Sequence, residues 1–220
     1  MVHPLYLAQK WSGCSGSDPW WQLVAIASLL ALCATTLGAW QETVFYLFCT
    51  WLYNERAWGD KSWWQRALMN ACGITTNRVA TLRVAIIATQ LETTAQLRFT
   101  EKGLGWFFIC AAIVFTTIQA QDLRDQDGDA LIDRQTLPLI LSDGLARWLT
   151  AVAIFTWSVI CPRYWHLNAL GCIIPILIGA AVSAHMLVYR TRGHDQSTFR
   201  LVGAWWVSLY FLPMMKTYRL

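Results

Sequence analysis

The sequence predicts an all-α fold, a polytopic membrane helical bundle of about seven transmembrane helices. Composition is the first observation: 56% of the 220 residues are hydrophobic and only 14% are charged, whereas soluble domains usually carry about 25% charged residues. The second is a series of apolar runs, several of which reach the roughly 20 residues that a helix needs to cross a bilayer. The third is the 14 Trp residues, because Trp favours the membrane–water interface.

Seven apolar segments follow one another along the chain. They cover about 19–39, 42–54, 64–89, 103–121, 145–161, 167–189 and 199–216. The first, fourth, sixth and seventh have the length of a spanning helix. The second is short, so a helix that crosses the membrane there has to begin earlier, near Trp40.

The third segment is long and contains Arg78 and Arg83. A charged side chain at membrane depth usually faces the interior of a bundle or a polar partner, which makes both residues candidates for the lining of a cavity. The alternative is a helix break near Gly73, which would leave Arg78 at an interface.

No repeat, low-complexity tract or linker divides the chain, so residues 1–220 are expected to form a single integral-membrane domain with an N-terminal tail at 1–17. Residues 1–16 contain one Lys and no adequate apolar stretch, which argues against a signal peptide. The seven Cys residues are scattered without metal-ligand spacing, and reduced thiols are expected rather than disulfides or a zinc site.

The distribution of Lys and Arg predicts the orientation. Seven alternating spans place the tail and the 54–64, 122–144 and 190–200 loops on one face. That face receives ten Lys and Arg residues and the other face five, which indicates that the first face is cytosolic. We therefore expect a multi-pass protein of the endoplasmic reticulum with its active site facing the cytosol.

The net charge is +4, and the sequence contains no dense basic stripe, so nucleic-acid binding is excluded. Nothing in the sequence points to an obligate protein partner.

Acidic residues concentrate in the stretch QDLRDQDGDALIDRQTLPLILSD, where five of the 13 Asp and Glu residues lie between 122 and 133. Asp122, Asp125 and Asp129 recur at i, i+3 and i+7, which places them on one face of a helix. Clustered carboxylates repel one another and favour a bound cation. Oxygen ligands suit Mg²⁺, which often bridges carboxylates to substrate phosphates. Because the cluster follows an apolar run, a substrate with an apolar tail and an anionic head would lie beside it.

The stretch allows two other interpretations. One is a solvated acidic loop, although the acids are not interleaved with Glu and Lys as they are on a solvated face. The other is an EF-hand, whose Gly and Glu positions are occupied here by Ala130 and Thr136. We reject the EF-hand.

The stretch resembles the second aspartate-rich motif of the UbiA superfamily of intramembrane prenyltransferases, DxxDxxxD followed by Thr-Leu-Pro. Asp122, Asp125 and Asp129 take the aspartate positions, and residues 136–138 take the ending. The first motif of that superfamily is eroded in YNERAWGDKSWWQRALMNACG. Asn54 matches its leading Asn, and no Pro-x-Arg-Pro follows.

The compact spacing and the RxxxNAxG pattern at 66–73 are similar to a fungal UbiA-like subgroup of secondary metabolism that includes membrane-bound sesquiterpene cyclases. The resemblance implies that Asp122, Asp125 and Asp129 are catalytic. The metal ligands that it implies for Mg²⁺ are Asp122, Asp125, Asp129, Asn54, Glu55 and Asp60. The residues expected to bind the diphosphate, by the resemblance and by their position, are Asn54, Arg66, Asn70, Arg78, Arg124 and Arg134.

Three functions remain open from the sequence. A terpene cyclase would ionise farnesyl diphosphate and quench the allylic cation within its own chain, whereas a prenyltransferase would pass the cation to an aromatic or other small acceptor. Both need Mg²⁺ and Arg or Lys to stabilise the departing diphosphate, and both must shield the cation from water. The third is a cation transporter or inactive scaffold. The missing Pro-x-Arg-Pro favours cyclisation.

Overall fold

The computed structural model describes residues 19–54, 56, 58–92 and 98–217, and within these ranges every regular element is helical. This confirms the all-α prediction for the described residues; the tail and Glu55 lie outside them. The helices are α2 (Pro19–Leu32), the π-helical η1 (Cys33–Leu37), α3 (Trp40–Asn54), α4 (Trp58–Lys61), α5 (Trp63–Glu92), α6 (Glu101–Thr117), α7 (Gln119–Leu131), α8 (Leu137–Leu141), α9 (Asp143–Tyr164), α10 (Ala169–Val188), α11 (Arg192–Tyr210) and α12 (Leu212–Thr217).

Three stretches of the described chain are long and apolar enough to cross a membrane: Glu101–Leu131, which joins α6 and α7, then α9 and α10. A shorter apolar stretch covers Val24–Leu37. The α3 and α5 helices do not combine the length and the apolar composition of a spanning helix, for separate reasons. The α3 helix has 15 residues, and the 30-residue α5 helix carries several polar and charged side chains. A membrane protein with several apolar helices is therefore supported, while the number of about seven spans stays a prediction.

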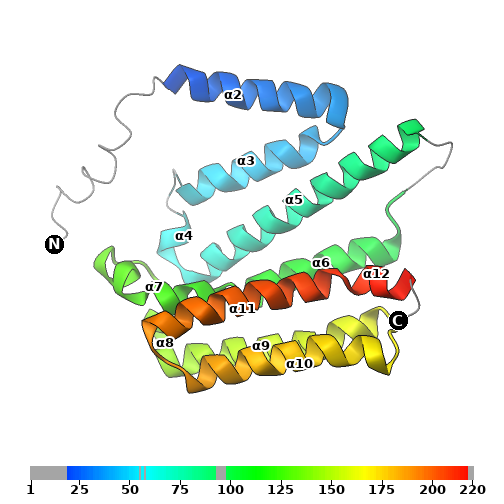
Figure 1. Cartoon of the computed structure of the whole chain (residues 1–220). Coiled ribbons are helices and arrows are strands. Elements are labelled where there is room, and N and C mark those ends of the chain that lie inside the picture. The colour runs from blue at the N-terminus through cyan, green and yellow to red at the C-terminus, as the bar shows by residue number, and fades with distance from the viewer. Residues whose placement is uncertain (1–18, 55, 57, 93–97, 218–220) are drawn as a thin grey trace.

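The helices run side by side in one stack, with α2 and α3 at one edge and α9 and α10 at the other (Figure 1). The turns between α3 and α5 and between α10 and α11 lie at the same end as α7 and α8. We call this end the motif end, because Asp60 and Arg66 of the first motif meet residues of the second motif there. We call these two motifs the first and the second acidic stretch. The expectation that the two stretches share one end of the bundle is confirmed.

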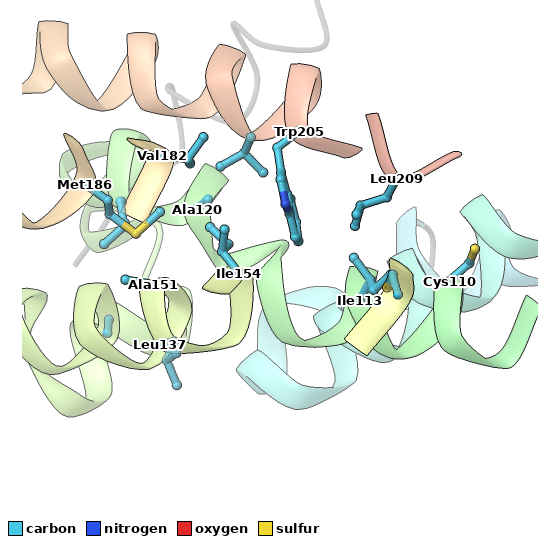
Figure 2. Close-up of a cluster of buried hydrophobic side chains, with 14 of the residues drawn as sticks. Cys110, Ile113, Ala120, Leu137, Ala151, Ile154, Val182, Met186, Trp205 and Leu209 are labelled. Carbon is cyan, nitrogen blue, oxygen red and sulfur yellow. The ribbon is translucent and has the colours of Figure 1, made fainter. Parts of the chain in front are cut away.

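The apolar core lies among α6, α9, α10 and α11. Figure 2 shows Trp205 of α11 reaching into the cluster that includes Ile154 and Val182. The indole N–H of Trp205 donates to Ser158 Oγ at 2.8 Å, so its one polar atom is satisfied inside the core. Gly179 of α10 packs against the same serine, and a Cβ there would collide with it. The α7 helix packs on α9 and α11, so the apolar core of these helices fixes its position.

One expectation about local structure was wrong, and one alternative does not occur. The 122–144 stretch is not a loop, because α7 covers Gln119–Leu131 and α8 and α9 follow after short turns. The reason is amphipathicity: α7 buries Ala120 and Leu123 with two of its Asp residues on one face. The alternative of a break near Gly73 does not occur, since α5 continues without interruption. The expected early start of the second segment is confirmed at Trp40.

Candidate active site

Two arginines connect the first acidic stretch to the second at the motif end. Arg66 of α5 places Nη2 2.9 Å from Asp122 Oδ1, and both side chains are almost fully buried. Arg134, just after α7, contacts Asp60 Oδ1 through Nε at 2.5 Å and Asp129 Oδ1 through Nη1 at 2.9 Å. The backbone N–H of Gln135 also donates to the Asp60 carbonyl at 3.1 Å. Opposite charges thus hold α4, α5 and α7 together at this point.

The carboxylates of α7 differ in exposure because of their places on the helix. Asp122 and Asp129 are each 3% exposed and face the bundle. Asp125 is half-buried and pairs with its neighbour Arg124 through two contacts of 2.8 Å. Asp127 points away from this face and is exposed, with Arg192 3.6 Å away. The helical face expected from the i, i+3, i+7 spacing is therefore present.

Electrostatics at Arg134 favour its charge. Partial burial acts against the guanidinium, but the hydrogen bond to Asp60 and the charges of Asp60 and Asp129 outweigh that cost and raise the pKa of Arg134. The residue therefore stays a cation at any physiological pH. A fixed positive group beside two carboxylates can also serve a phosphate, which guanidinium recognises through paired N–H groups.

The predicted metal ligands do not form a ready-made cluster. Within the described ranges, no three His, Cys, Asp or Glu side chains are grouped closely enough to hold a metal ion. Each α7 carboxylate instead faces an arginine. The donor chemistry still fits Mg²⁺, because only oxygen ligands are offered and Asp129 Oδ2 is buried without a hydrogen-bond partner. Asp122 and Asp129, with Asp60 opposite, are the residues that would hold such an ion.

A cavity of about 370 Å³ opens between α3 and α5. Its polar lining includes Asn54, Asn70, Asn77 and Arg78. A second cavity of about 390 Å³ shares Tyr46 and Asn77 with the first and continues along the same helices toward η1. Its lining is more apolar; the side chains that supply this character are Leu29, Leu37, Ala39, Ala80 and Val84. We call the two cavities together the α3–α5 lane. Their volumes lie in the usual range for small-molecule sites.

The structure separates the predicted diphosphate residues into two groups. Arg66, Arg124 and Arg134 pair with carboxylates at the motif end. A second group lines the lane: Asn54, Asn70 and Arg78. The Asn70 side chain donates a hydrogen bond to the carbonyl of Arg66 at 2.9 Å, so part of its hydrogen-bonding capacity is used within α5.

Arg78 does not join Arg66, Arg124 and Arg134 at the motif end. From residue 66 to residue 78 an α-helix advances about 18 Å, at about 1.5 Å per residue. The guanidinium instead stacks on the ring of Tyr210, 3.4 Å from the ring centroid. This is a cation–π contact in the bundle interior rather than a position beside Asp122.

Sequence reasoning missed two polar connections. Glu42 is buried and pairs with Arg83, with Arg83 Nη2 2.8 Å from Glu42 Oε1. The signal was available, because an arginine inside an apolar segment usually has an acidic or polar partner. Gln126, within the acidic stretch of α7, donates to Asp143 Oδ1 of α9 at 2.8 Å. Nothing in the local sequence singles out that pair.

Comparison with known proteins agrees with the geometry. The model of the UbiA prenyltransferase family matches residues 20–210. Somaliensene A/B synthase of Streptomyces somaliensis is 26% identical over 208 residues, which cover 87% of this chain and 64% of that protein. Fumagillin beta-trans-bergamotene synthase of Aspergillus fumigatus is 28% identical over 107 residues, 49% of this chain and 37% of that protein. The chain thus spans less than two thirds of either relative. No solved structure matches.

Proposed function

Because this chain belongs to the UbiA prenyltransferase family, we propose that it ionises a prenyl diphosphate in the membrane and cyclises farnesyl diphosphate to a sesquiterpene in secondary metabolism. One observation carries this proposal. Carboxylates and arginines from both acidic stretches meet at the motif end, beside a lane that becomes apolar with distance from that end. A molecule with a diphosphate head and a prenyl tail matches this gradient.

In the proposed reaction the bond between the first prenyl carbon and the diphosphate oxygen breaks, and its electron pair leaves with the diphosphate. Mg²⁺, when bound, supplies positive charge that stabilises this leaving group. Arg66 and Arg134 lie beside the carboxylates that would hold the ion, so they can donate N–H groups to diphosphate oxygens. The apolar lining of the lane limits water around the cation.

Two observations favour cyclisation over transfer to an aromatic acceptor. Both relatives described above are named as synthases of terpenes rather than as prenyltransferases. The first acidic stretch also lacks the Pro-x-Arg-Pro that follows this motif in those members of the resembled superfamily that use an acceptor. The protein would work as a single domain of the endoplasmic reticulum membrane with its motif end in the cytosol, with prenyl diphosphate and the bilayer as its partners.

The test uses microsomes that contain the full chain, supplied with farnesyl diphosphate and Mg²⁺. Diphosphate release is measured, and the headspace is analysed by gas chromatography. We expect a cyclic sesquiterpene without any added acceptor, and no release when the metal is chelated. Release only after addition of a phenol or quinone precursor, with a prenylated adduct, would select the transferase. No release under either condition would favour a transporter or scaffold.

A further inference from the structure

Glu42 is a buried acid that the diphosphate chemistry does not use. It lies near the start of α3, is 9% exposed, and lines the apolar half of the α3–α5 lane. Burying a carboxylate is costly unless the charge is paired and hydrogen-bonded. A buried carboxylate that borders a cavity therefore calls for a functional explanation.

The pairing of Glu42 is incomplete. Arg83 Nη2 lies 2.8 Å from Oε1 of Glu42, and Arg83 Nη1 donates to Gln41 Oε1 at 3.3 Å. The second carboxylate oxygen, Oε2, is buried and has no hydrogen-bond partner. The arginine thus fixes one oxygen, while the other keeps unused lone pairs on a residue that borders the cavity.

The position of Glu42 fits the length of a farnesyl chain. Residues 42 and 54 lie at opposite ends of α3, about 18 Å apart at about 1.5 Å per residue. An extended carbon chain gains roughly 1.2 Å per bond, so a farnesyl backbone of about eleven bonds reaches about 13 Å. A diphosphate held at the motif end would therefore bring the distal isoprene units to within about 5 Å of the level of residue 42 along α3, a gap that the Glu42 side chain can span.

We propose that Glu42 is the base that ends the carbocation reaction, an inference that rests on the cyclase function proposed above. Oε2 removes a proton from a carbon adjacent to the final cationic carbon. The electron pair of the broken C–H bond forms the new C=C bond, which discharges the cation and gives a neutral hydrocarbon. Glu42 becomes a neutral carboxylic acid and returns its proton to water after the product leaves.

The principal test replaces one oxygen of the carboxylate. Glu42→Gln keeps the size and a hydrogen-bond acceptor for Arg83 but removes the base. We expect diphosphate release within about threefold of wild type, while the share of the main hydrocarbon falls at least about tenfold, in line with the loss of a positioned general base. Alcohols from water capture, or other alkene isomers, should replace it. Glu101→Gln, at an exposed acid at the start of α6, is the matched control and should leave the product profile unchanged.

A second variant keeps the charge. Glu42→Asp withdraws the carboxylate by one methylene while it can still pair with Arg83, so it should shift the ratio of alkene isomers with the consumption rate retained. An unchanged product profile in Glu42→Gln, or a lower rate with the same products, would assign Glu42 a structural role and overturn the inference. Absence of diphosphate release in wild type would instead count against the proposed function, so the two failures are distinguishable.

Discussion

At the scale of single residues, arginine provides the counter-charge at the motif end. Arg66 neutralises Asp122, and Arg134 neutralises Asp129, the two buried carboxylates of α7. A buried charge that lost its partner would be strongly destabilising. The same guanidinium groups are the natural donors for a diphosphate, so in the proposed reaction they would pass from carboxylate to substrate when a metal takes their place.

Replacing Asp122 by asparagine tests this arrangement. Asp122→Asn keeps the shape of the side chain but removes the charge that Mg²⁺ and Arg66 require. We expect diphosphate release to fall at least about 100-fold, the usual scale for loss of one electrostatic group in an active site. The control is Asp127→Asn on the exposed face of the same helix, which should stay within about threefold. Wild-type turnover in Asp122→Asn would refute the site.

At the scale of helices, α7 is linked through Gln126 to an ionic network that reaches three neighbours and whose central pair, Arg147 and Asp195, is buried. Gln126 of α7 bonds Asp143, which also accepts from Arg147 Nε at 2.8 Å. Arg147 in turn forms a two-pronged contact with Asp195 of α11, at 2.6 and 2.8 Å. It also donates to the Met186 carbonyl of α10 at 3.2 Å. The network therefore fixes where α7 presents its aspartates.

Removal of the central arginine should destabilise the bundle. Arg147→Met leaves Asp195 buried without its partner, which typically costs about 3–5 kcal/mol. Thermal unfolding in detergent can be followed with a thiol-reactive dye, because Cys49, Cys110 and Cys161 are buried in the fold. We expect a clear drop in Tm for Arg147→Met and little change for the exposed control Arg163→Met. Equal Tm values would contradict a stabilising role for the network.

The helices themselves were largely predictable, for a simple reason. Apolar runs mark where a chain must close its backbone hydrogen bonds in lipid. The expected 167–189 segment accordingly corresponds to α10 at Ala169–Val188. The α7 helix was predicted only in part, because the i, i+3, i+7 spacing indicated a helical face while the wider 122–144 stretch was assigned to a loop. The burial of Asp122 depends on its tertiary pairing with Arg66 of α5, and no local hydrophobic pattern reports it.

At the scale of the whole molecule, the candidate site was predictable in outline only. The spacing of the aspartates indicated a shared face, and the apolar run before them indicated the membrane boundary. The pairing of Arg66 with Asp122 depends on how α5 and α7 are rotated against each other, which spacing within one helix does not determine. The distance of Arg78 from the motif end could have been predicted from the sequence, since the distance between two residues of α5 follows from the helical rise.

The orientation of the bundle gives the last prediction. The excess of Lys and Arg on one face predicts that the motif end lies in the cytosol, and this end also has to receive a charged substrate from water. In sealed microsomes, a membrane-impermeant maleimide should label Asp127→Cys at the motif end without detergent. Glu101→Cys, at the opposite end where α6 begins, should be labelled only after permeabilisation. Labelling of the parent chain is subtracted as background. Reversed accessibility would place the motif end in the lumen, and equal labelling of both positions would contradict a spanning α6–α7 segment.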